Sequence, residues 1–454
     1  MLARGKISQT HTFINKNILS LRKSQETNRL KKENTMLIEF TVGNFLSLYT
    51  RRTLNFRAAA ISDLDHSFEA GRYKLLPAAV VYGANSSGKS NLLKALATMR
   101  GVLLDSVKLN AGDPLSFTPF MLAENSVTEP TYFEIEFLID DKKIRYGYEY
   151  NQTRIVSEWL YESTAKAEKP LFVRTEEGIG VATNFKEGQG KEEATNDNRL
   201  FVSLVAQLGG ETCKKIIAWF QGCNLISGLT NQGYSLITMQ MIQHRMHGFD
   251  DALQLFKKLQ LGFNDIITRE TTIVTDLMKD QVAEPFKDLV KGIEGKKFLR
   301  MKTLHNKYNA DGQVIDTVLF DKDSHESEGT KKIIDLSGPV FDTLLTGKVL
   351  IVDELDAKLH PLLTREIVNL FNSKETNPKH AQLLFATHDT NLLSADIFRR
   401  DQVWFTEKDE VEQTDLYNLV EFRLPDGSKV RNDSNLERNY IRGRYGAIPY
   451  ITAQ

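Results

Sequence analysis

The feature that most constrains the fold of this chain is the octapeptide Gly-Ala-Asn-Ser-Ser-Gly-Lys-Ser at residues 83–90, which matches the pattern G-x-x-x-x-G-K-[ST]. The apolar residues 78–82 before it predict a buried strand, and from Gly88 onward apolar residues recur at helical spacing. This pattern requires a strand on one side and a helix on the other, so its context supports a phosphate-binding loop. The chain is therefore expected to contain an α/β domain built around this loop.

The residue types in the loop explain how it would bind a nucleotide. Gly83 and Gly88 let the backbone turn tightly enough to aim its N–H groups at phosphate oxygens, at the positive end of the following helix. Lys89 is expected to reach the β- and γ-phosphates of ATP, and Ser90 to ligate Mg²⁺. The residues expected to contact the nucleotide are Gly83, Asn85, Ser86, Ser87, Gly88, Lys89, Ser90 and Asn91.

Two further apolar strands end in polar residues. Residues 349–352 lead into Asp353 and Glu354, and residues 383–386 lead towards His388. A buried strand would hold Asp353 where it can ligate Mg²⁺, and Glu354 can polarise the attacking water as general base. A neutral imidazole at His388 can hydrogen-bond the γ-phosphate and that water. The predicted catalytic residues are thus Lys89, Glu354 and His388, and the predicted metal ligands are Ser90 and Asp353.

In this order, the three motifs resemble the ABC-type ATPase head of structural-maintenance-of-chromosomes, recombination-repair and overcoming-lysogenization-defect proteins. The resemblance runs from residue 36 to the C-terminus, apart from an insertion, and implies an α/β P-loop ATPase head with an antiparallel β subdomain. It also implies a signature loop, here Ser-Glu-Gly-Thr at residues 327–330, whose Ser327 and Gly329 contact the ATP held by another copy. The implied assembly is a homodimer or higher even oligomer that encloses and hydrolyses ATP with Mg²⁺.

Three other segments are similar to stand-alone bacterial ATPases of antiphage defence operons, especially those of the RloA type. They are the opening at residues 36–45, the Leu-His-Pro element at residues 359–361 and the tail at residues 440–449. This resemblance implies an ATPase that senses or clamps and controls a separate effector protein, a nuclease. The residues after His388 are too few for a fused Toprim nuclease and contain no Asp-x-Asp pair, so the nuclease is expected on a partner chain.

The chain divides into four expected parts. Residues 1–35 contain eight Lys or Arg and two acids, and are expected to form a disordered extension. Residues 36–170 are expected to be the N-terminal lobe of the head, with the P-loop and a β meander at residues 131–160. Residues 171–300 are expected to form a loop or hairpin and then a mostly helical insertion, and residues 301–454 the C-terminal lobe with signature, tandem acids, histidine and tail.

Composition limits the partners and the compartment. Lys and Arg total 58 against 59 Asp and Glu, so the molecule as a whole does not attract nucleic acid. Basic clusters at residues 291–302 and 429–444 could each contact a phosphate backbone or form a solvated face, and Tyr440 and Tyr445 could stack on bases or clasp the head. No segment is long and apolar enough to span a bilayer, and two cysteines cannot form a disulfide framework. A cytoplasmic protein without a membrane contact is expected.

Two alternative functions remain open at this stage. A short repair or recombination ATPase would act directly on DNA. A transporter nucleotide-binding subunit would dock on a membrane partner, but the signature at residues 327–330 differs from the Leu-Ser-Gly-Gly-Gln of transporters, and His360 stands where transporters usually carry Asp.

Overall fold

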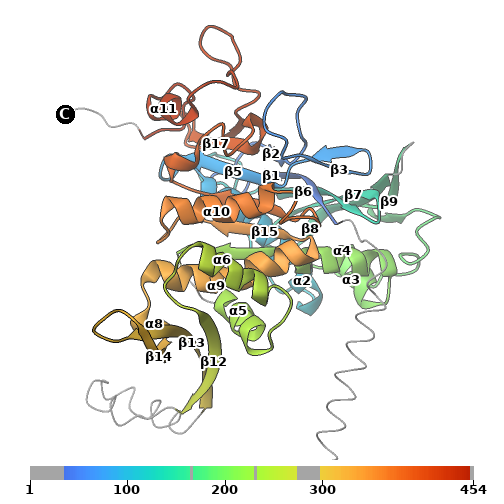
Figure 1. Cartoon of the computed structure of the whole chain (residues 1–454). Helices are drawn as coiled ribbons and strands as arrows, with labels where there is room; N and C mark the ends of the chain where they lie inside the picture. Colours follow the sequence, from blue (N-terminus) through green and yellow to red (C-terminus); the bar gives the residue numbers. More distant parts are fainter. Residues whose placement is uncertain (1–34, 164–166, 230–232, 273–296, 450–454) are drawn as a thin grey trace, which may run out of the picture.

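The computed structural model of the 454-residue chain describes residues 35–163, 167–229, 233–272 and 297–449. The predicted basic extension at residues 1–35 lies outside these ranges except for its last residue. Two large β-sheets form the body of the molecule, and helices cover them (Figure 1). None of the helices in the described ranges combines the length and the apolar character needed to cross a bilayer.

A six-stranded sheet carries the predicted motifs. In spatial order its strands are β11 (Asn224–Ser227), β15 (Val349–Asp353), β16 (Gln382–Ala386), β5 (Ala78–Gly83), β17 (Val403–Lys408) and β18 (Thr414–Asn418). All neighbours are parallel except β17 and β18. Ala79 and Val81 of β5 face one hydrophobic core, whereas Ala78, Val80 and Tyr82 face the other, because side chains alternate along a strand. Both faces of this sheet are therefore covered, as its continuous apolar strands predict.

A seven-stranded antiparallel sheet makes up the β subdomain. In spatial order its strands are β10 (Gly178–Val181), β9 (Glu168–Thr175), β8 (Ile155–Ser163), β7 (Lys142–Tyr150), β6 (Thr131–Ile139), β1 (Leu37–Gly43) and β2 (Arg52–Asn55). The predicted meander corresponds to β6, β7 and β8, and the predicted loop or hairpin is the β9–β10 hairpin. Residue 170, where the N-terminal lobe is expected to end, lies inside β9, whose first three residues are exposed.

A buried glutamine joins the two sheets. Gln382 of β16 accepts a hydrogen bond from the Leu37 N–H (2.7 Å) and donates one to the Leu37 carbonyl (2.9 Å) in β1. Leaving a buried amide without partners would be costly, so these two bonds fix β1 against the core sheet. Helix α2 (Lys89–Asp105) fills the same hydrophobic core, into which Leu92, Leu96 and Met99 point.

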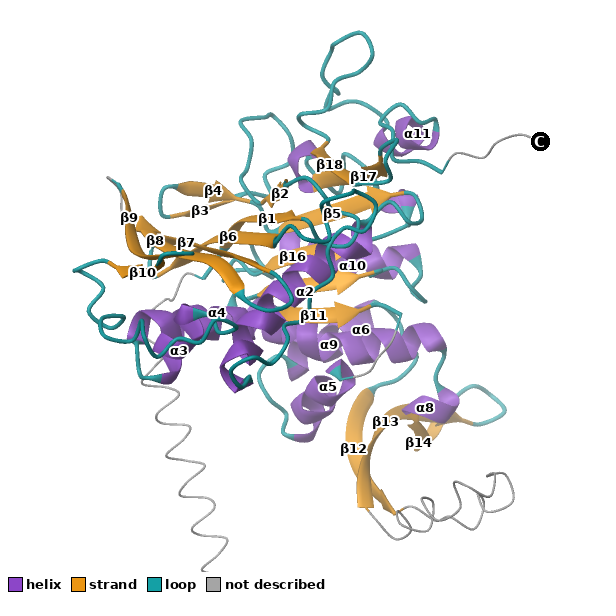
Figure 2. Ribbon diagram, turned by 180° about the vertical axis from the view of Figure 1, so that it is seen from behind, coloured by secondary structure: helices purple, strands orange, loops and turns teal. Residues whose placement is uncertain are grey.

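The remaining helices cover both sheets (Figure 2). α9 (Glu328–Thr346) and α10 (Pro361–Asn372) lie on the core-sheet face opposite α2, and α5 (Tyr234–Gln243) and α6 (Phe249–Lys258) contact α9. α3 (Phe201–Gln207) and α4 (Glu211–Gly222) contact each other and α2. The described part of the predicted helical insertion also contains β11, which is an edge of the core sheet, and β12 (Asp265–Thr272). The predicted insertion thus contributes a strand to the core sheet as well as the helices α3, α4, α5 and α6.

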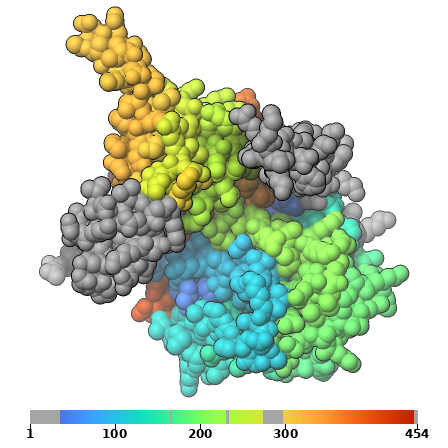
Figure 3. Space-filling view, turned by 90° about the horizontal axis from the view of Figure 1, so that it is seen from below, coloured from blue at the N-terminus to red at the C-terminus, as the bar shows by residue number. Residues whose placement is uncertain are grey.

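A three-stranded antiparallel sheet, the arm, projects from the body (Figure 3). It consists of β12, β13 (Lys297–Tyr308) and β14 (Val314–Asp321), with the short helix α8 (Lys322–His325) after it. Three apolar side chains at its end are more than half exposed, namely Tyr308 (57%), Val314 (56%) and Ile315 (58%). The described basic residues of the cluster predicted at residues 291–302 are Lys297, Arg300 and Lys302, and all three lie on β13. They form ion pairs with acids of β12 and β14. These pairs favour a solvated face over a contact with a phosphate backbone.

The C-terminal tail clasps the head. In α11 (Leu436–Ile441), Tyr440 is buried and its ring lies 5.4 Å from that of Phe405 and 5.8 Å from that of Tyr82, measured between centroids. Tyr445 is also buried, and its carbonyl accepts a hydrogen bond from the Tyr417 hydroxyl (2.7 Å). Because both rings are buried, neither can stack on a nucleic acid base. The tyrosines therefore hold the tail on the head, which is the structural role considered above.

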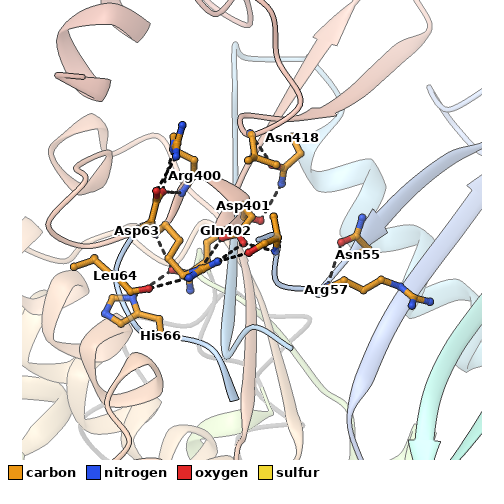
Figure 4. Close-up of polar contacts among 12 residues, drawn as sticks. Asn55, Arg57, Asp63, Leu64, His66, Arg400, Asp401, Gln402 and Asn418 are labelled. Carbon is orange, nitrogen blue, oxygen red and sulfur yellow. Dashed lines mark hydrogen bonds and ion pairs between the residues drawn. The ribbon is translucent and has the colours of Figure 1, made fainter. Parts of the chain in front are cut away.

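Ion pairs fasten the segment after β2 to the base of β17 (Figure 4). The Arg400 guanidinium pairs with Asp63 at 2.8 Å, and the neighbouring Arg399 pairs with Asp401 at 2.7 Å and donates to the Leu64 carbonyl. Burial with a satisfied hydrogen-bonding set makes such pairs costly to break from one side only. The remaining short elements are β3 (Phe68–Ala70), β4 (Tyr73–Leu75), and the 3-10 helices η3 (Thr390–Leu392), η4 (Arg400–Gln402) and η2 (Ser106–Lys108), of which η2 follows α2.

Replacement of Tyr440 by alanine should destabilise the protein. The variant loses a buried ring between Phe405 and Tyr82 and the hydrogen bond from the Tyr440 hydroxyl to the Ala447 carbonyl (2.9 Å). We expect the free energy of unfolding, measured by chemical denaturation, to fall by about 3–5 kcal/mol. The control is Ile441→Ala, because that side chain is 58% exposed and its loss should be nearly neutral. Equal effects of the two substitutions would contradict a clasp made by Tyr440.

Candidate nucleotide-binding site

The octapeptide forms a tight loop between β5 and α2. Gly88 precedes α2 with a φ of 109°, a left-handed conformation that L side chains rarely adopt, and a Cβ there would collide with Thr414. A Cβ at Gly83 would lie 2.5 Å from the Thr406 carbonyl oxygen. Both glycines are thus required because β17 and β18 press against the loop.

Lys89 is buried under this loop. Its Nζ donates hydrogen bonds to the carbonyls of Gly83 (2.8 Å) and Ala84 (3.0 Å). Burial lowers the pKa of Lys89 to about 8, against the attraction of Asp353 and Glu354, which favours the charged form. The ammonium group therefore lies among the loop carbonyls and near the carboxylates of Asp353 and Glu354. Phosphate oxygens of a nucleotide on the loop would replace these carbonyls as its hydrogen-bond acceptors.

A hydrogen bond of 3.0 Å from Ser90 Oγ to Asp353 Oδ1 joins the start of α2 to the end of β15. A hydroxyl and a carboxylate are hard oxygen donors of the kind that Mg²⁺ takes from proteins, alongside waters and substrate phosphates. No group of three or more His, Cys, Asp or Glu suited to a metal occurs within the ranges that the structure describes. The pair therefore fits an Mg²⁺ that is completed by a nucleotide, and not a cage made by the protein alone.

Glu354 follows Asp353 with a φ of 56°, in the left-handed region. Such a conformation costs about 1–3 kcal/mol in a residue other than glycine, and it clusters at functional sites. The next carboxylate, Asp356, accepts a hydrogen bond from the backbone N–H of His388 at 3.4 Å. This links the loop after β15 to the loop after β16.

His388 stands at the end of β16, beside these acids. Partial burial of the ring, together with the Lys89 ammonium, lowers the pKa of His388 below its usual value, although Asp356, Glu354 and Asp353 act in the opposite direction. The lowered pKa favours the neutral imidazole, in which one nitrogen can donate and the other can accept a hydrogen bond.

The signature residues lie elsewhere, at the exposed start of α9. Ser327 Oγ caps the helix by accepting a hydrogen bond from the Thr330 N–H (3.1 Å). Glu328 forms ion pairs with Lys331 (3.0 Å) and Lys358 (2.9 Å). In the described part of the chain, no hydrogen bond joins Ser327 or Gly329 to the phosphate-binding loop. The structure thus brings together Lys89, Ser90, Asp353, Glu354 and His388, but not the signature.

The other predicted nucleotide contacts divide into two groups. Asn85 and Ser86 are exposed on the loop, whereas the Ser87 side chain is buried and bonds the Thr406 hydroxyl at 2.6 Å. The Asn91 amide donates a hydrogen bond to Ser47 Oγ (2.8 Å), so this side chain joins the start of α2 to the segment after β1.

Three residues near the loop are absent from the sequence-based prediction. Thr414 Oγ1 donates to the Ser87 carbonyl (2.9 Å) and also bonds Ser47 Oγ (2.7 Å), and Thr406 bonds Ser87. Nothing in the residue types of Ser47, Thr406 or Thr414 identifies them as loop contacts. The pairing of β17 with β5 places Thr406 beside the loop, and the pairing of β18 with β17 places Thr414 there. Ser47, which follows β1, joins them through its bond to Thr414.

Solved structures with low identity include three heads of structural-maintenance-of-chromosomes proteins. One is bound to the C-winged helix domain of ScpA (14% identity, 84% of this chain and 97% of that chain, TM-score 0.44). Another comes from Thermotoga maritima (12%, 84% and 98%, TM-score 0.38). The third, from Pyrococcus furiosus, has an extended coiled coil and is bound to the C-terminal domain of ScpA (13%, 85% and 96%, TM-score 0.39).

A search of curated proteins finds no relative of this chain. A family model, described as "AAA domain, putative AbiEii toxin, Type IV TA system", matches residues 78–221 and 275–394. These ranges include the phosphate-binding loop, the signature, the tandem acids and the histidine. The match covers more than half of the residues, and the chain therefore belongs to this family of AAA domains.

Proposed function

We propose that this protein is an Mg²⁺-dependent ATPase in which two copies enclose two ATP molecules. The observation that supports the proposal is that the loop residues and the signature residues form two groups, which no hydrogen bond joins within the described ranges. Lys89, Ser90 and Asp353 lie together, whereas Ser327 and Gly329 lie at an exposed helix start with no hydrogen bond to that loop. A signature placed in this way is free to contact the ATP of another copy.

Each residue has a role in this scheme. Backbone N–H groups of the loop and the Lys89 ammonium bind the phosphates, and Ser90 and Asp353 would hold Mg²⁺, which neutralises phosphate charge when bound. Glu354 accepts a proton from the attacking water as general base. His388, neutral because of its lowered pKa, hydrogen-bonds the γ-phosphate and so distinguishes ATP from ADP.

The work driven by hydrolysis is proposed to be control of a separate effector, a nuclease, in antiphage defence. Support comes from the matched family, whose description refers to a toxin of a toxin–antitoxin system. ATP binding would close the pair of heads and hydrolysis would open it, which gives a partner two states to distinguish. The test is to purify the protein with the products of neighbouring genes and to assay nuclease activity with ATP, with ADP and with Glu354→Gln.

A second candidate is an ATPase that acts directly on DNA. Arg438, Arg442 and Arg444 of the tail are exposed, and none forms an ion pair within the described residues. Stimulation of ATP turnover by DNA, lost at high salt and in Arg442→Gln, would favour this function over control of a partner protein.

Glu354→Gln and Lys89→Ala should behave differently. Glu354→Gln removes the general base, so it should bind ATP, slow turnover by about 10²–10⁴-fold and accumulate as a dimer with twice the mass of the monomer. Lys89→Ala should lose ATP binding and stay monomeric. Nucleotide binding and light-scattering mass measure both. Ser327→Arg in the Glu354→Gln background is the control, since it should bind ATP without dimerising, and a dimer that survives this substitution contradicts the shared site.

ATP affinity should decrease at alkaline pH. The pKa of Lys89 is about 8 in the free protein, and bound phosphates favour its charged form, so binding above pH 8 requires uptake of a proton. The dissociation constant should rise by about tenfold per pH unit above pH 8 until the pKa of the complex is reached. Lys89→Arg keeps its charge throughout this range, so calorimetry on this variant should show a nearly flat profile. The same slope in both proteins would contradict the role of Lys89.

A further inference from the structure

A buried lysine that the scheme above does not use lies in the second turn of α9. Lys332 is 1% exposed, and its Nζ donates a hydrogen bond to the Gly228 carbonyl at the end of β11. The ammonium also lies 5.7 Å from the centroid of the Tyr234 ring. Burial lowers the pKa of Lys332 to about 8, against the attraction of Asp335. Burial of a cation is costly, and a leucine or methionine would fill this position without that cost.

Gly228 in turn contacts the backbone of the tandem acids. Its N–H donates to the Asp353 carbonyl at 2.6 Å, and β11 is parallel to β15 with Ser227 opposite Asp353. A Cβ at Gly228 would overlap the carbonyl oxygen of Glu354. The end of β11 is therefore packed directly against Glu354, the residue with the left-handed φ of 56°. A displacement of Gly228 cannot leave the Glu354 peptide in place, because close-packed atoms have no room to absorb it.

Helix α9 is held to α5 just after Lys332, at Asp335 and Gly338. Pro339 has no N–H for the Asp335 carbonyl four residues earlier, and the Thr238 hydroxyl of α5 donates to that carbonyl instead (2.6 Å). Thr238 Oγ1 also accepts a hydrogen bond from the Gly338 N–H (2.9 Å). This part of α9 is therefore held to α5, whereas the N-cap of the helix, Ser327, lies only five residues before Lys332.

We propose that Lys332 is a positioning residue that couples the signature to the general base through Gly228. Contact of Ser327 with the ATP of another copy would shift the start of α9, and Lys332 would pass that shift to Gly228 and so to the Glu354 peptide. Hydrolysis would then be fast only in the paired state. This inference rests on the proposed function, since it assumes that Glu354 is the base and that Ser327 acts on a second copy.

The chain offers a matched control in a second buried lysine. Lys322 of α8 is 4% exposed and bonds Asp335 at 2.7 Å, but its bonds do not include Gly228. Both lysines lie beside the same carboxylate, so Lys322→Met and Lys332→Met remove comparable buried charges. Only Lys332→Met breaks the path to Glu354.

The experiment compares kcat, KM and ATP binding in full-length variants at temperatures at which each is folded. Lys332→Met should reduce kcat by about 10–100-fold and leave the ATP dissociation constant within about twofold, as expected for a misplaced catalytic group. Lys322→Met should lower the melting temperature and leave kcat within about twofold. Gly228→Ala should also lower kcat, because its Cβ would displace the Glu354 carbonyl. This variant replaces Lys332→Met in the experiment if Lys332→Met does not fold.

A double-mutant cycle tests the coupling to the base. In the Glu354→Gln background, Lys332→Met should cause no further loss of the residual turnover, because two residues that act through one group are not additive. Unchanged kcat in both Lys332→Met and Gly228→Ala, or full additivity with Glu354→Gln, would overturn the inference. Failure of the proposed function looks different, since the wild-type protein would then not hydrolyse ATP or Ser327→Arg would have no effect.

Discussion

The candidate site depends on the contact between Ser90 and Asp353, which are 263 residues apart in the chain and are joined by a hydrogen bond. It holds the start of α2 to the end of β15, and so it brings together two motifs that neither lobe could use alone. The parallel pairing of β15, β16 and β5 makes this possible, because the carboxyl ends of parallel strands meet at one edge of a sheet. Lys89, Ser90, Asp353, Glu354 and His388 are arranged around that edge.

The sequence was informative wherever one local pattern carried both the strand and its chemistry. The loop at residues 83–90, the acids after β15 and the histidine after β16 each follow a short apolar run, so the strand ends and their polar residues could be predicted together. The head fold was expected from the family resemblance, and the antiparallel meander from the alternating pattern at residues 131–160.

What the sequence could not predict depends on contacts between distant segments. Thr414 bonds Ser87, which lies 327 residues earlier in the chain. Gly228 contacts Asp353 only because β11 is the edge strand next to β15. Local composition also misled where strands are exposed. β9 begins with three exposed residues and reads as a loop, and β12 lies within a stretch whose apolar residues mostly follow a helical period.

The arm has an exposed strand edge to which another strand could pair. Among the described strands β14 pairs only with β13, so its other edge presents free backbone groups flanked by Val314, Ile315 and Val318. Asp316, set opposite Lys307 in the hairpin, interrupts this apolar series. Adding another strand to that edge would require a carboxylate to lose water, which is unfavourable. Among the described residues of the arm, Asp316 therefore disfavours edge-to-edge association of β14.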